Sequence, residues 1–269
     1  MTCKITLLER VYGADVEDGL KSARMLLKKD FSELNVAIKE ISLDDKGRLV
    51  VTLEGEDEEA AKNFLAQRYG CTRSLSELKE GGVYRGHVVN PLYYGYGFYV
   101  DIGVVHPAPK DALVPLYKLR KQLVGDRKVP LRMIARAFCF VENLPVEVKV
   151  VKVDPARNKI EAELSEREIE RLNEWVKSKF DRVVVCGATR QQVRRAIIKS
   201  GHLRDIVAIE RLGLMEHAIV CKYGTDAPGI IAEVGDYLRN ATLRAFIPEE
   251  VRKIISSAQP ETENPTSES

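Results

Sequence analysis

The amino-acid sequence predicts an α+β protein of several domains, with a central five-stranded β-barrel flanked by two ferredoxin-like α+β units. Three observations support this fold class. Five short strand patterns follow one another between residues 77 and 165, and a long basic connection separates the third from the fourth. On either side, strand patterns alternate with helix patterns. The length of 269 residues suits two or three small domains.

In residues 1–76, hydrophobic spacing predicts a strand, a helix, two strands and a second helix. The predicted elements are residues 5–11, 16–31, 36–43, 49–53 and 58–69. The sequence Asp-Asp-Lys-Gly at 44–47 predicts a hairpin turn between the two middle strands. This order is one strand short of a ferredoxin-like unit, and residues 71–75 are the candidate for the missing strand.

Residues 181–257 predict the complete β-α-β-β-α-β order. The predicted elements are residues 182–186, 189–199, 206–212, 215–223, 228–238 and 243–247. Residues 166–180 are predicted to form a linker helix, which Ser165 and Glu168 open with the spacing of a capping box. Residues 258–269 have almost no apolar side chains and are predicted to form a disordered tail.

The middle segment, residues 77–165, predicts only strands outside one insertion. The predicted strands are residues 83–89, 96–102, 112–116, 146–154 and 159–164. The insertion, residues 117–140, is basic and partly helical. Five strands with a helical connection after the third have the element order of an OB-type barrel.

The residues of this segment resemble an S1-type RNA-binding domain. The similarity runs through five stretches in order: Leu-Lys-Glu-Gly-Gly-Val-Tyr-Arg-Gly-His-Val (78–88), Tyr-Gly-Phe-Tyr-Val-Asp-Ile-Gly (96–103), Ala-Leu-Val-Pro-Leu (112–116), Val-Glu-Val-Lys-Val-Val-Lys-Val-Asp (146–154) and Ile-Glu-Ala-Glu-Leu-Ser (160–165). It covers about a third of the chain. The whole chain is also similar to an uncharacterised archaeal family of unknown function, which implies a source and no mechanism.

The S1 resemblance implies that RNA lies across the second and third strands and stacks on exposed aromatic rings. The matching positions are Tyr96 and Tyr99, and Gly97 between them permits a bulge that turns both rings to one face. His87 on the first strand could extend this platform. The third strand departs from the pattern, because Pro115 stands where many S1 domains have a His, which removes one ring and one hydrogen-bond donor.

A basic rim beside the platform would supply the positive charge that single-strand binding needs. Lys and Arg outnumber Asp between residues 110 and 136, although such an insertion could equally be a solvated helix face or grip a protein partner. The candidate RNA-contacting residues are Tyr84, His87, Tyr94, Tyr96, Tyr99, Lys118, Arg120, Lys121, Arg127, Lys128, Arg132 and Lys149. Arg136 belongs to the same rim.

Two turns outside the barrel have the form of ligand-binding loops. Residues 186–189 join a strand to a helix, and their N–H groups could hold a phosphate, with Arg190, Arg194 and Arg195 as secondary contacts to the RNA backbone. An ordinary capped turn is the alternative. Residues 225–234 resemble the strand-to-helix turn of amino-acid-binding ACT domains, but they precede the second helix of the unit instead of the first, which argues against ligand binding.

Sequence patterns of catalysis and metal binding are missing. The four histidines, at positions 87, 106, 202 and 217, fall on separate predicted elements, and the five cysteines have no close spacing. We therefore expect no enzymatic activity, no metal and no cofactor. Asp101 falls where S1 domains often have a structural Asp.

These observations predict a cytoplasmic RNA-binding protein that acts as an accessory factor in translation, RNA processing or transcription. The expected partner is single-stranded RNA or an exposed RNA loop, within a ribosomal, RNA-processing or RNA polymerase complex and away from membranes. A net charge of only +2 excludes binding by charge alone. The alternative is a protein-interaction adaptor whose barrel has lost RNA binding, which burial of both Tyr96 and Tyr99 would favour.

Overall fold

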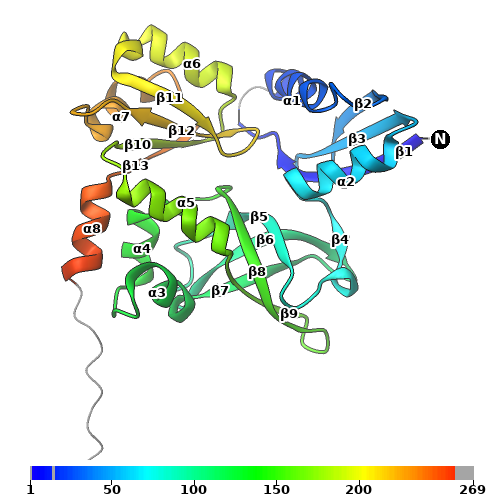
Figure 1. The fold of residues 1–269 in the computed structure, drawn as a ribbon, viewed down its shortest axis with the longest axis horizontal. Helices are drawn as coiled ribbons and strands as arrows, with labels where there is room; N and C mark the ends of the chain where they lie inside the picture. Colours follow the sequence, from blue (N-terminus) through cyan, green and yellow to red (C-terminus); the bar gives the residue numbers. More distant parts are fainter. Residues whose placement is uncertain (1, 14–15, 258–269) are drawn as a thin grey trace, which may run out of the picture.

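The computed structural model describes residues 2–13 and 16–257, and the strands in these ranges form three sheets (Figure 1). The N-terminal sheet has the strand order β1-β3-β2, and the C-terminal sheet has the order β11-β12-β10-β13. The strands between them form a barrel, which lies below both sheets in the view of Figure 1. The tail predicted for residues 258–269 lies outside the described residues.

The N-terminal unit packs two helices against its sheet. Its elements are β1 (Thr2–Arg10), α1 (Val16–Asp30), β2 (Val36–Leu43), β3 (Arg48–Gly55) and α2 (Glu58–Tyr69). Ala23 of α1 and Leu65 of α2 are fully buried in one cluster with Leu7 and Leu53 of the sheet. Alternate residues of a strand share a face, so this apolar face determines which side of the sheet the helices cover.

The segment predicted as the missing strand, residues 71–75, takes a different course. Cys71 forms a single antiparallel bridge with Leu7 of β1. The chain then leaves that sheet, and β4 (Arg73–Ser74) pairs in parallel with the barrel strand β6. These residues therefore connect the N-terminal sheet to the barrel instead of completing the sheet.

Five strands close the OB-like barrel. They are β5 (Val83–Val89), β6 (Gly97–His106), β7 (Lys110–Pro115), β8 (Pro145–Asp154) and β9 (Lys159–Leu164). Pairing runs around the ring in the order β5-β6-β7-β9-β8 and returns to β5. Phe98, Val100 and Ile102 alternate along β6 and are fully buried in the interior.

Strand β6 is longer than predicted. We expect it to end at Gly103, but it continues to His106. Gly103 has a φ of 87°, and the pairing of β6 with β7 changes register between Val100 and Val104. A glycine at positive φ lets the strand bend and continue, so this glycine marks a bulge and not a strand end.

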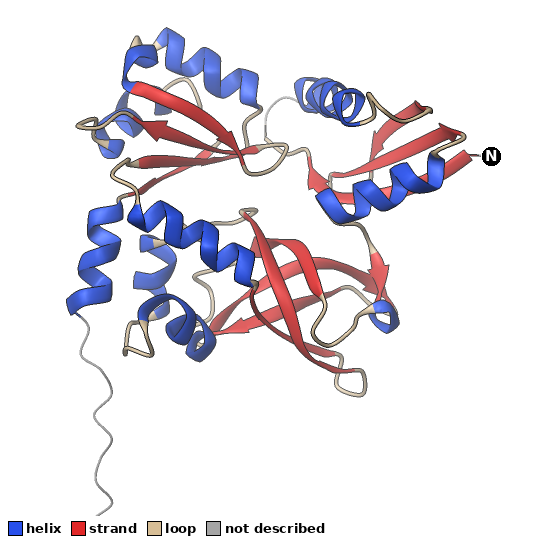
Figure 2. Ribbon diagram, viewed as in Figure 1, coloured by secondary structure: helices blue, strands red, loops and turns tan. Residues whose placement is uncertain are grey.

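Helices cover one side of the barrel (Figure 2). The basic insertion forms α3 (Leu116–Val124) and α4 (Leu131–Ala137), and α5 (Glu166–Lys177) lies between the barrel and the C-terminal sheet in Figure 1. Leu119 of α3 and Ile134 of α4 are fully buried in the barrel core. The Ser165 hydroxyl caps α5 by accepting from the Glu168 N–H at 3.1 Å. The second bond of the predicted capping box, from the Ser165 N–H to the Glu168 side chain, does not form, because the Ser165 N–H donates to the Glu147 carbonyl.

The C-terminal unit has the predicted β-α-β-β-α-β order and one further helix. Its elements are β10 (Arg182–Cys186), α6 (Arg190–Lys199), β11 (Ile206–Arg211), β12 (Glu216–Cys221), α7 (Ala227–Gly235), β13 (Thr242–Phe246) and α8 (Pro248–Ser257). Its central strands, β10 and β12, are buried on both faces. Val183 and Val185 face a core that includes residues of α6 and α7, whereas Val184 and Cys186 join the core of the barrel.

The turn between β11 and β12 joins the C-terminal unit to the N-terminal unit. Leu214 and Met215 are buried in the core of the N-terminal sheet, although they belong to the opposite end of the sequence. On the barrel side, Trp175 of α5 packs edge-on against Phe246 of β13 at a centroid distance of 5.2 Å. Within the described ranges, no helix combines the length and the apolar character needed to cross a bilayer.

Candidate nucleic-acid interface and buried polar junction

Four tyrosines gather at the start of β6, on the outside of the barrel. Tyr94 contacts three rings, with centroid distances of 4.6 Å to Tyr93, 5.3 Å to Tyr96 and 5.5 Å to Tyr99. The hydroxyls of Tyr96 and Tyr99 lie 3.1 Å apart. Tyr93, Tyr94 and Tyr96 are exposed at 76%, 37% and 52%, and Tyr99 is half-buried. The two rings predicted as a platform therefore lie together at the surface. We call these four residues the tyrosine cluster.

Gly97 is needed because the third barrel strand approaches it closely, and the bulge expected there is absent, since β6 pairs regularly with β7 from Gly97 to Val100. A Cβ at Gly97 would lie 2.4 Å from the Val114 carbonyl oxygen and 2.9 Å from the Cα of Pro115. Pro115 itself is buried and directly precedes α3. The residue that departs from the S1 pattern thus occupies a packed strand end and not the exposed face.

A shallow pocket of about 300 Å³ adjoins the tyrosine cluster. Its lining residues are Val89, Asn90, Tyr94, Tyr99, Pro109, Lys110 and Asp111. Lys110 is the basic residue among them. The hydrogen bond with Tyr96, followed by partial burial, raises the pKa of Tyr99 to about 12, so its hydroxyl stays protonated and able to donate at neutral pH.

The predicted basic rim divides into two groups. Lys118 forms an ion pair with Glu163 at 3.0 Å, and the side chains of Arg120 and Arg127 donate to the carbonyls of Val129 and Val124. These three cations therefore hold the insertion together. The exposed cations of the insertion are Lys121, Lys128, Arg132 and Arg136, and Lys149 on β8 is half-buried.

Two further predicted RNA-contacting residues take part in local packing. His87 is only 2% exposed, because its side chain points from β5 into the junction described below, so it cannot stack on a bound base and that expectation is corrected. Tyr84 is half-buried, its hydroxyl accepts from the Lys79 N–H at 2.9 Å, and the Arg73 guanidinium lies 4.6 Å from its ring centroid.

The secondary contacts on α6 are exposed, but the turn before them is a capped turn. The N–H groups of Gly187 and Ala188 both donate to the Met215 carbonyl and are not free to hold a phosphate. Thr189 and Gln192 form a reciprocal capping box at the start of α6. In the same way, Asp226 caps α7 by accepting from the Gly229 N–H at 2.7 Å, which gives the ACT-like turn a structural role. Arg190, Arg194 and Arg195 are exposed on α6.

Asp101 joins the barrel to the N-terminal sheet. Its carboxylate accepts from the Arg48 guanidinium at 2.6 Å and from Arg10, and its second oxygen accepts from the Gly103 N–H at 2.9 Å. Burial acts to raise the pKa of Asp101, but the charge and hydrogen bond of Arg48 outweigh it and hold the pKa below the ordinary 3.8. The structural role expected for Asp101 is therefore present.

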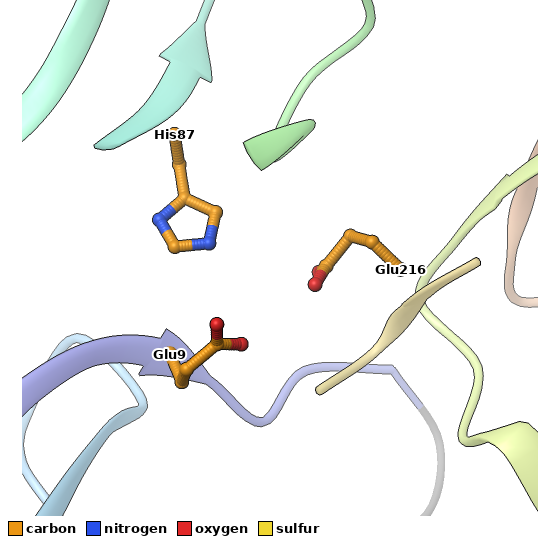
Figure 3. A group of neighbouring side chains, drawn as sticks. All are labelled: Glu9, His87 and Glu216. Carbon is orange, nitrogen blue, oxygen red and sulfur yellow. The ribbon is translucent and has the colours of Figure 1, made fainter. Parts of the chain in front are cut away.

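Next to this ion pair, three buried side chains from the three sheets face one another (Figure 3). They are Glu9 of β1, His87 of β5 and Glu216 of β12, and one nitrogen or oxygen of each lies within 4.8 Å of the others. Burial raises the pKa of Glu9, and burial together with the Glu9 charge raises the pKa of Glu216 to about 8. Burial and the nearby Arg85 lower the pKa of His87 to about 3, so its ring is neutral. We call these residues the buried triad.

Sequence patterns gave no sign of the buried triad, because its members lie far apart along the chain. A signal that was available is the charge itself, since Glu9 and Glu216 each interrupt an apolar strand pattern. A larger cleft of about 770 Å³ opens beside the triad. Glu9, Arg85 and Gly213 line it, together with charged residues of α2 and α5.

Similar solved structures cover different shares of the chain. An uncharacterised protein from Methanocaldococcus jannaschii is 13% identical with a TM-score of 0.24, over 34% of this chain and 96% of that chain. The a/eIF2alpha–aDim2p–rRNA complex from Pyrococcus horikoshii OT3 contains a chain that is 17% identical with a TM-score of 0.25. The match covers 48% of this chain and 70% of that chain. The intact alpha subunit of aIF2 from Pyrococcus abyssi is 12% identical with a TM-score of 0.24, and the match covers 62% of this chain and 97% of that chain. Scores of this size carry no argument about function.

Family models give a clearer result, whereas no curated protein matches the chain. The DUF2110 N-terminal domain matches residues 4–74, the DUF2110 central domain matches residues 78–176, and the DUF2110 C-terminal domain matches residues 180–246. Together these matches span most of the sequence, in one order and without overlap. The chain therefore belongs to the DUF2110 family.

Proposed function

We propose that this protein binds single-stranded RNA on the outer face of an S1-type barrel, flanked by two ferredoxin-like units. The observation that carries the proposal is the tyrosine cluster, whose rings are exposed together at the start of β6. In OB-type barrels the second and third strands and the loop between the first two form the usual binding face. Tyr93, Tyr94 and Tyr96 fall in or at the end of that loop, and Tyr99 falls on β6.

Stacking supplies the affinity in this proposal. Each base stacked on an aromatic ring contributes about 1–3 kcal/mol, and any base can stack. Tyr94, Tyr96 and Tyr99 therefore offer surface for two or three bases without requiring a particular sequence. Their contacts with one another fix the rings before RNA arrives, which reduces the entropy lost on binding.

Electrostatic attraction has a smaller part than the sequence alone implies. Of the predicted rim, Lys118 pairs with Glu163 of β9, and Arg120 and Arg127 donate to carbonyls within the insertion. Lys121, Arg132 and Arg136 are exposed, and they supply the contacts to phosphate in this proposal. With so few contacts, affinity falls with salt less steeply than for a strongly basic protein.

The test is fluorescence anisotropy of a labelled single-stranded RNA at two salt concentrations. The variants Tyr94→Ala and Tyr96→Ala each weaken binding by about 5- to 150-fold at both concentrations, which corresponds to one lost stacking contact. Tyr223→Ala is the matched control, because Tyr223 is 75% exposed on the C-terminal unit, outside the tyrosine cluster. Equal effects at Tyr96 and Tyr223 would contradict a specific platform.

Charge reversal tests the second part of the proposal. Log affinity falls as log salt concentration rises, and the double variant Lys121→Glu/Arg132→Glu makes this negative slope shallower by about 1–2. Lys21→Glu with Arg24→Glu makes the same charge change on the exposed face of α1 and serves as control. If both pairs change the slope equally, the exposed cations of the insertion do not contact RNA.

We propose binding without catalysis, as part of a ribosomal, RNA-processing or transcription complex. A protein-interaction adaptor is the second candidate, and the internal use of Lys118, Arg120 and Arg127 favours it. The same titration separates the two functions. Absence of binding by the unaltered protein at low salt would exclude the RNA proposal and leave the adaptor.

A further inference from the structure

The buried triad combines one potential ligand from each of the three sheets. Glu9, His87 and Glu216 are exposed at only 1%, 2% and 1%. Figure 3 shows both carboxylates and the imidazole directed into one common space. Two ionised carboxylates at this distance repel each other in a medium of low dielectric constant, so the arrangement needs either a shared proton or a bound cation.

One carboxylate oxygen of the buried triad lacks a hydrogen bond. Glu9 Oε1 is buried and has no hydrogen-bond partner among the described residues. The Arg85 guanidinium forms an ion pair with this oxygen at 3.5 Å, but it donates its hydrogen bond to the Leu212 carbonyl. A buried carboxylate oxygen without a hydrogen bond is costly, and in native structures such an atom indicates a water, an ion or a functional role.

We propose that Glu9, His87 and Glu216 bind one divalent transition-metal ion, such as Zn²⁺ or Mn²⁺. The donor set of one imidazole nitrogen and two carboxylate oxygens suits these ions better than Ca²⁺ or Mg²⁺, which prefer oxygen alone. Ligand distances of about 2.0–2.2 Å in tetrahedral geometry place the donor atoms about 3.3–3.6 Å from one another. The three donor atoms now lie within 4.8 Å of one another, so binding draws them together by up to about 1.5 Å.

Hydrogen bonds around the triad hold the carboxylates in place, as expected for ligands of a metal. Glu9 Oε2 accepts from the Leu214 N–H at 2.7 Å. Glu216 Oε1 accepts from the Tyr12 hydroxyl at 2.5 Å, and Glu216 Oε2 accepts from the Met215 N–H at 3.2 Å. Each carboxylate is thus fixed through at least one oxygen.

Gly213 completes the site by leaving room for the carboxylates. A Cβ at this position would lie 2.1 Å from Glu216 Oε2 and 3.1 Å from Glu9 Oε2. The cleft of about 770 Å³, which Glu9 and Gly213 also line, brings solvent to the Glu9 side of the site. Arg85 opposes a cation here, but 28% of its side chain is exposed, so it can turn into the cleft when the ion enters.

A metal at this position would fasten the three sheets to one another, since each ligand belongs to a different sheet. The role is structural and independent of RNA binding, because none of the three side chains is exposed. The absence of any paired His or Cys spacing explains why the sequence predicts no metal at all. The ion's binding energy would add to the stability of the assembled protein and to no single unit alone.

The first measurement is the metal content of the full-length protein purified without chelator, by elemental analysis. Expected is close to one transition-metal ion per chain. The second is thermal unfolding of protein dialysed against EDTA, with and without ZnCl₂ or MnCl₂. When the free metal concentration is about 100 times Kd, the midpoint temperature of unfolding rises by about 5–10 °C.

The variants Glu9→Gln and Glu216→Gln test the ligands and keep the shape of the side chains. Each leaves a single ionisable carboxyl in the buried pair, so the metal-free midpoint stays unchanged or rises while the response to metal is lost. The control is His202→Gln, because His202 and Asp205 form a His–carboxylate pair 2.8 Å apart near the surface that could bind ions adventitiously. That variant keeps the full response.

Two results would overturn the proposal. One is that no transition metal accompanies the purified protein and neither ion shifts the midpoint of the unaltered chain, which would mean that a shared proton holds the carboxylates. The other is that Glu216→Gln responds to metal as strongly as the unaltered chain. RNA titrations on the same samples measure RNA binding directly, so failure of the metal proposal can be distinguished from failure of the proposed function.

Discussion

Replacement of Asp101 by Asn should reveal how strongly the N-terminal sheet is fastened to the barrel. The change keeps the size of the side chain and its bond from the Gly103 N–H, but it removes the negative charge between Arg10 and Arg48. The Arg48 side chain is only 3% exposed, so its charge cannot reach water when its partner is lost. The Arg10 side chain is 19% exposed and can partly rehydrate.

Removal of one partner from a buried ion pair costs about 3–5 kcal/mol, because the remaining charge stays buried without compensation. We expect a loss of this size for Asp101→Asn, most of it from Arg48. The surface pair of Glu249 and Lys253, with both side chains about 70% exposed, provides the control. Glu249→Gln should change the free energy of unfolding by less than about 1 kcal/mol.

Urea unfolding followed by circular dichroism measures both variants. The fluorescence of Trp175, the single tryptophan, reports separately on the helix between the barrel and the C-terminal sheet. The folded-state pKa of Asp101 lies below 3.8, so its contribution is present above that pH and is lost as pH falls through the folded-state value. The difference between Asp101→Asn and the unaltered chain should therefore shrink below about pH 3.8. A loss under about 1 kcal/mol at pH 7 would refute the assignment of Asp101 as a fastening residue.

Two further substitutions test the packing around the sites. Gly97→Ala places a Cβ 2.4 Å from the Val114 carbonyl oxygen, so it should lower the free energy of unfolding in urea by about 1–3 kcal/mol and weaken RNA binding. Gly95→Ala is the control and should be neutral, because the space around Gly95 is open. Equal effects of the two variants would contradict the close approach of β7. Leu214→Ala should cost about 2–5 kcal/mol by leaving a cavity in the N-terminal core, and the exposed Leu203→Ala should cost little; a neutral Leu214→Ala would show that the turn does not stabilise that core.

Local patterns predicted most of the elements, because each depends on residues close in sequence. Strands β5 and β9 and helix α2 have the predicted bounds, and the capping residues Thr189 and Asp226 begin helices as their side chains favour. Helix α8 was not predicted, although Pro248 at its start and apolar residues at 251, 254 and 255 are a helix signal. The exposure of Tyr96 was expected from the S1 resemblance and not from alternation, because Phe98, two residues further on, is fully buried.

The sites that join the three sheets could not be predicted in the same way. His87 falls on a strand where the resemblance favours an exposed ring, but it is buried beside Glu9 and Glu216, which belong to two other sheets. Likewise, Arg48 and Asp101 lie on different sheets, so no spacing rule connects them. Long-range contacts of this kind depend on how completed units pack, which a single sequence does not encode in any local period.

The insertion of the β11–β12 turn into the N-terminal core also has a consequence for biosynthesis. Residues 2–69 leave the ribosome before residues 214 and 215 exist, and at about 5–20 residues per second the interval is on the order of 10 s. During that time the nascent N-terminal unit has an apolar gap where Leu214 and Met215 will lie. Completion of its folding is thus coupled to synthesis of the opposite end of the chain, and the open gap is a surface that a molecular chaperone can recognise while translation continues.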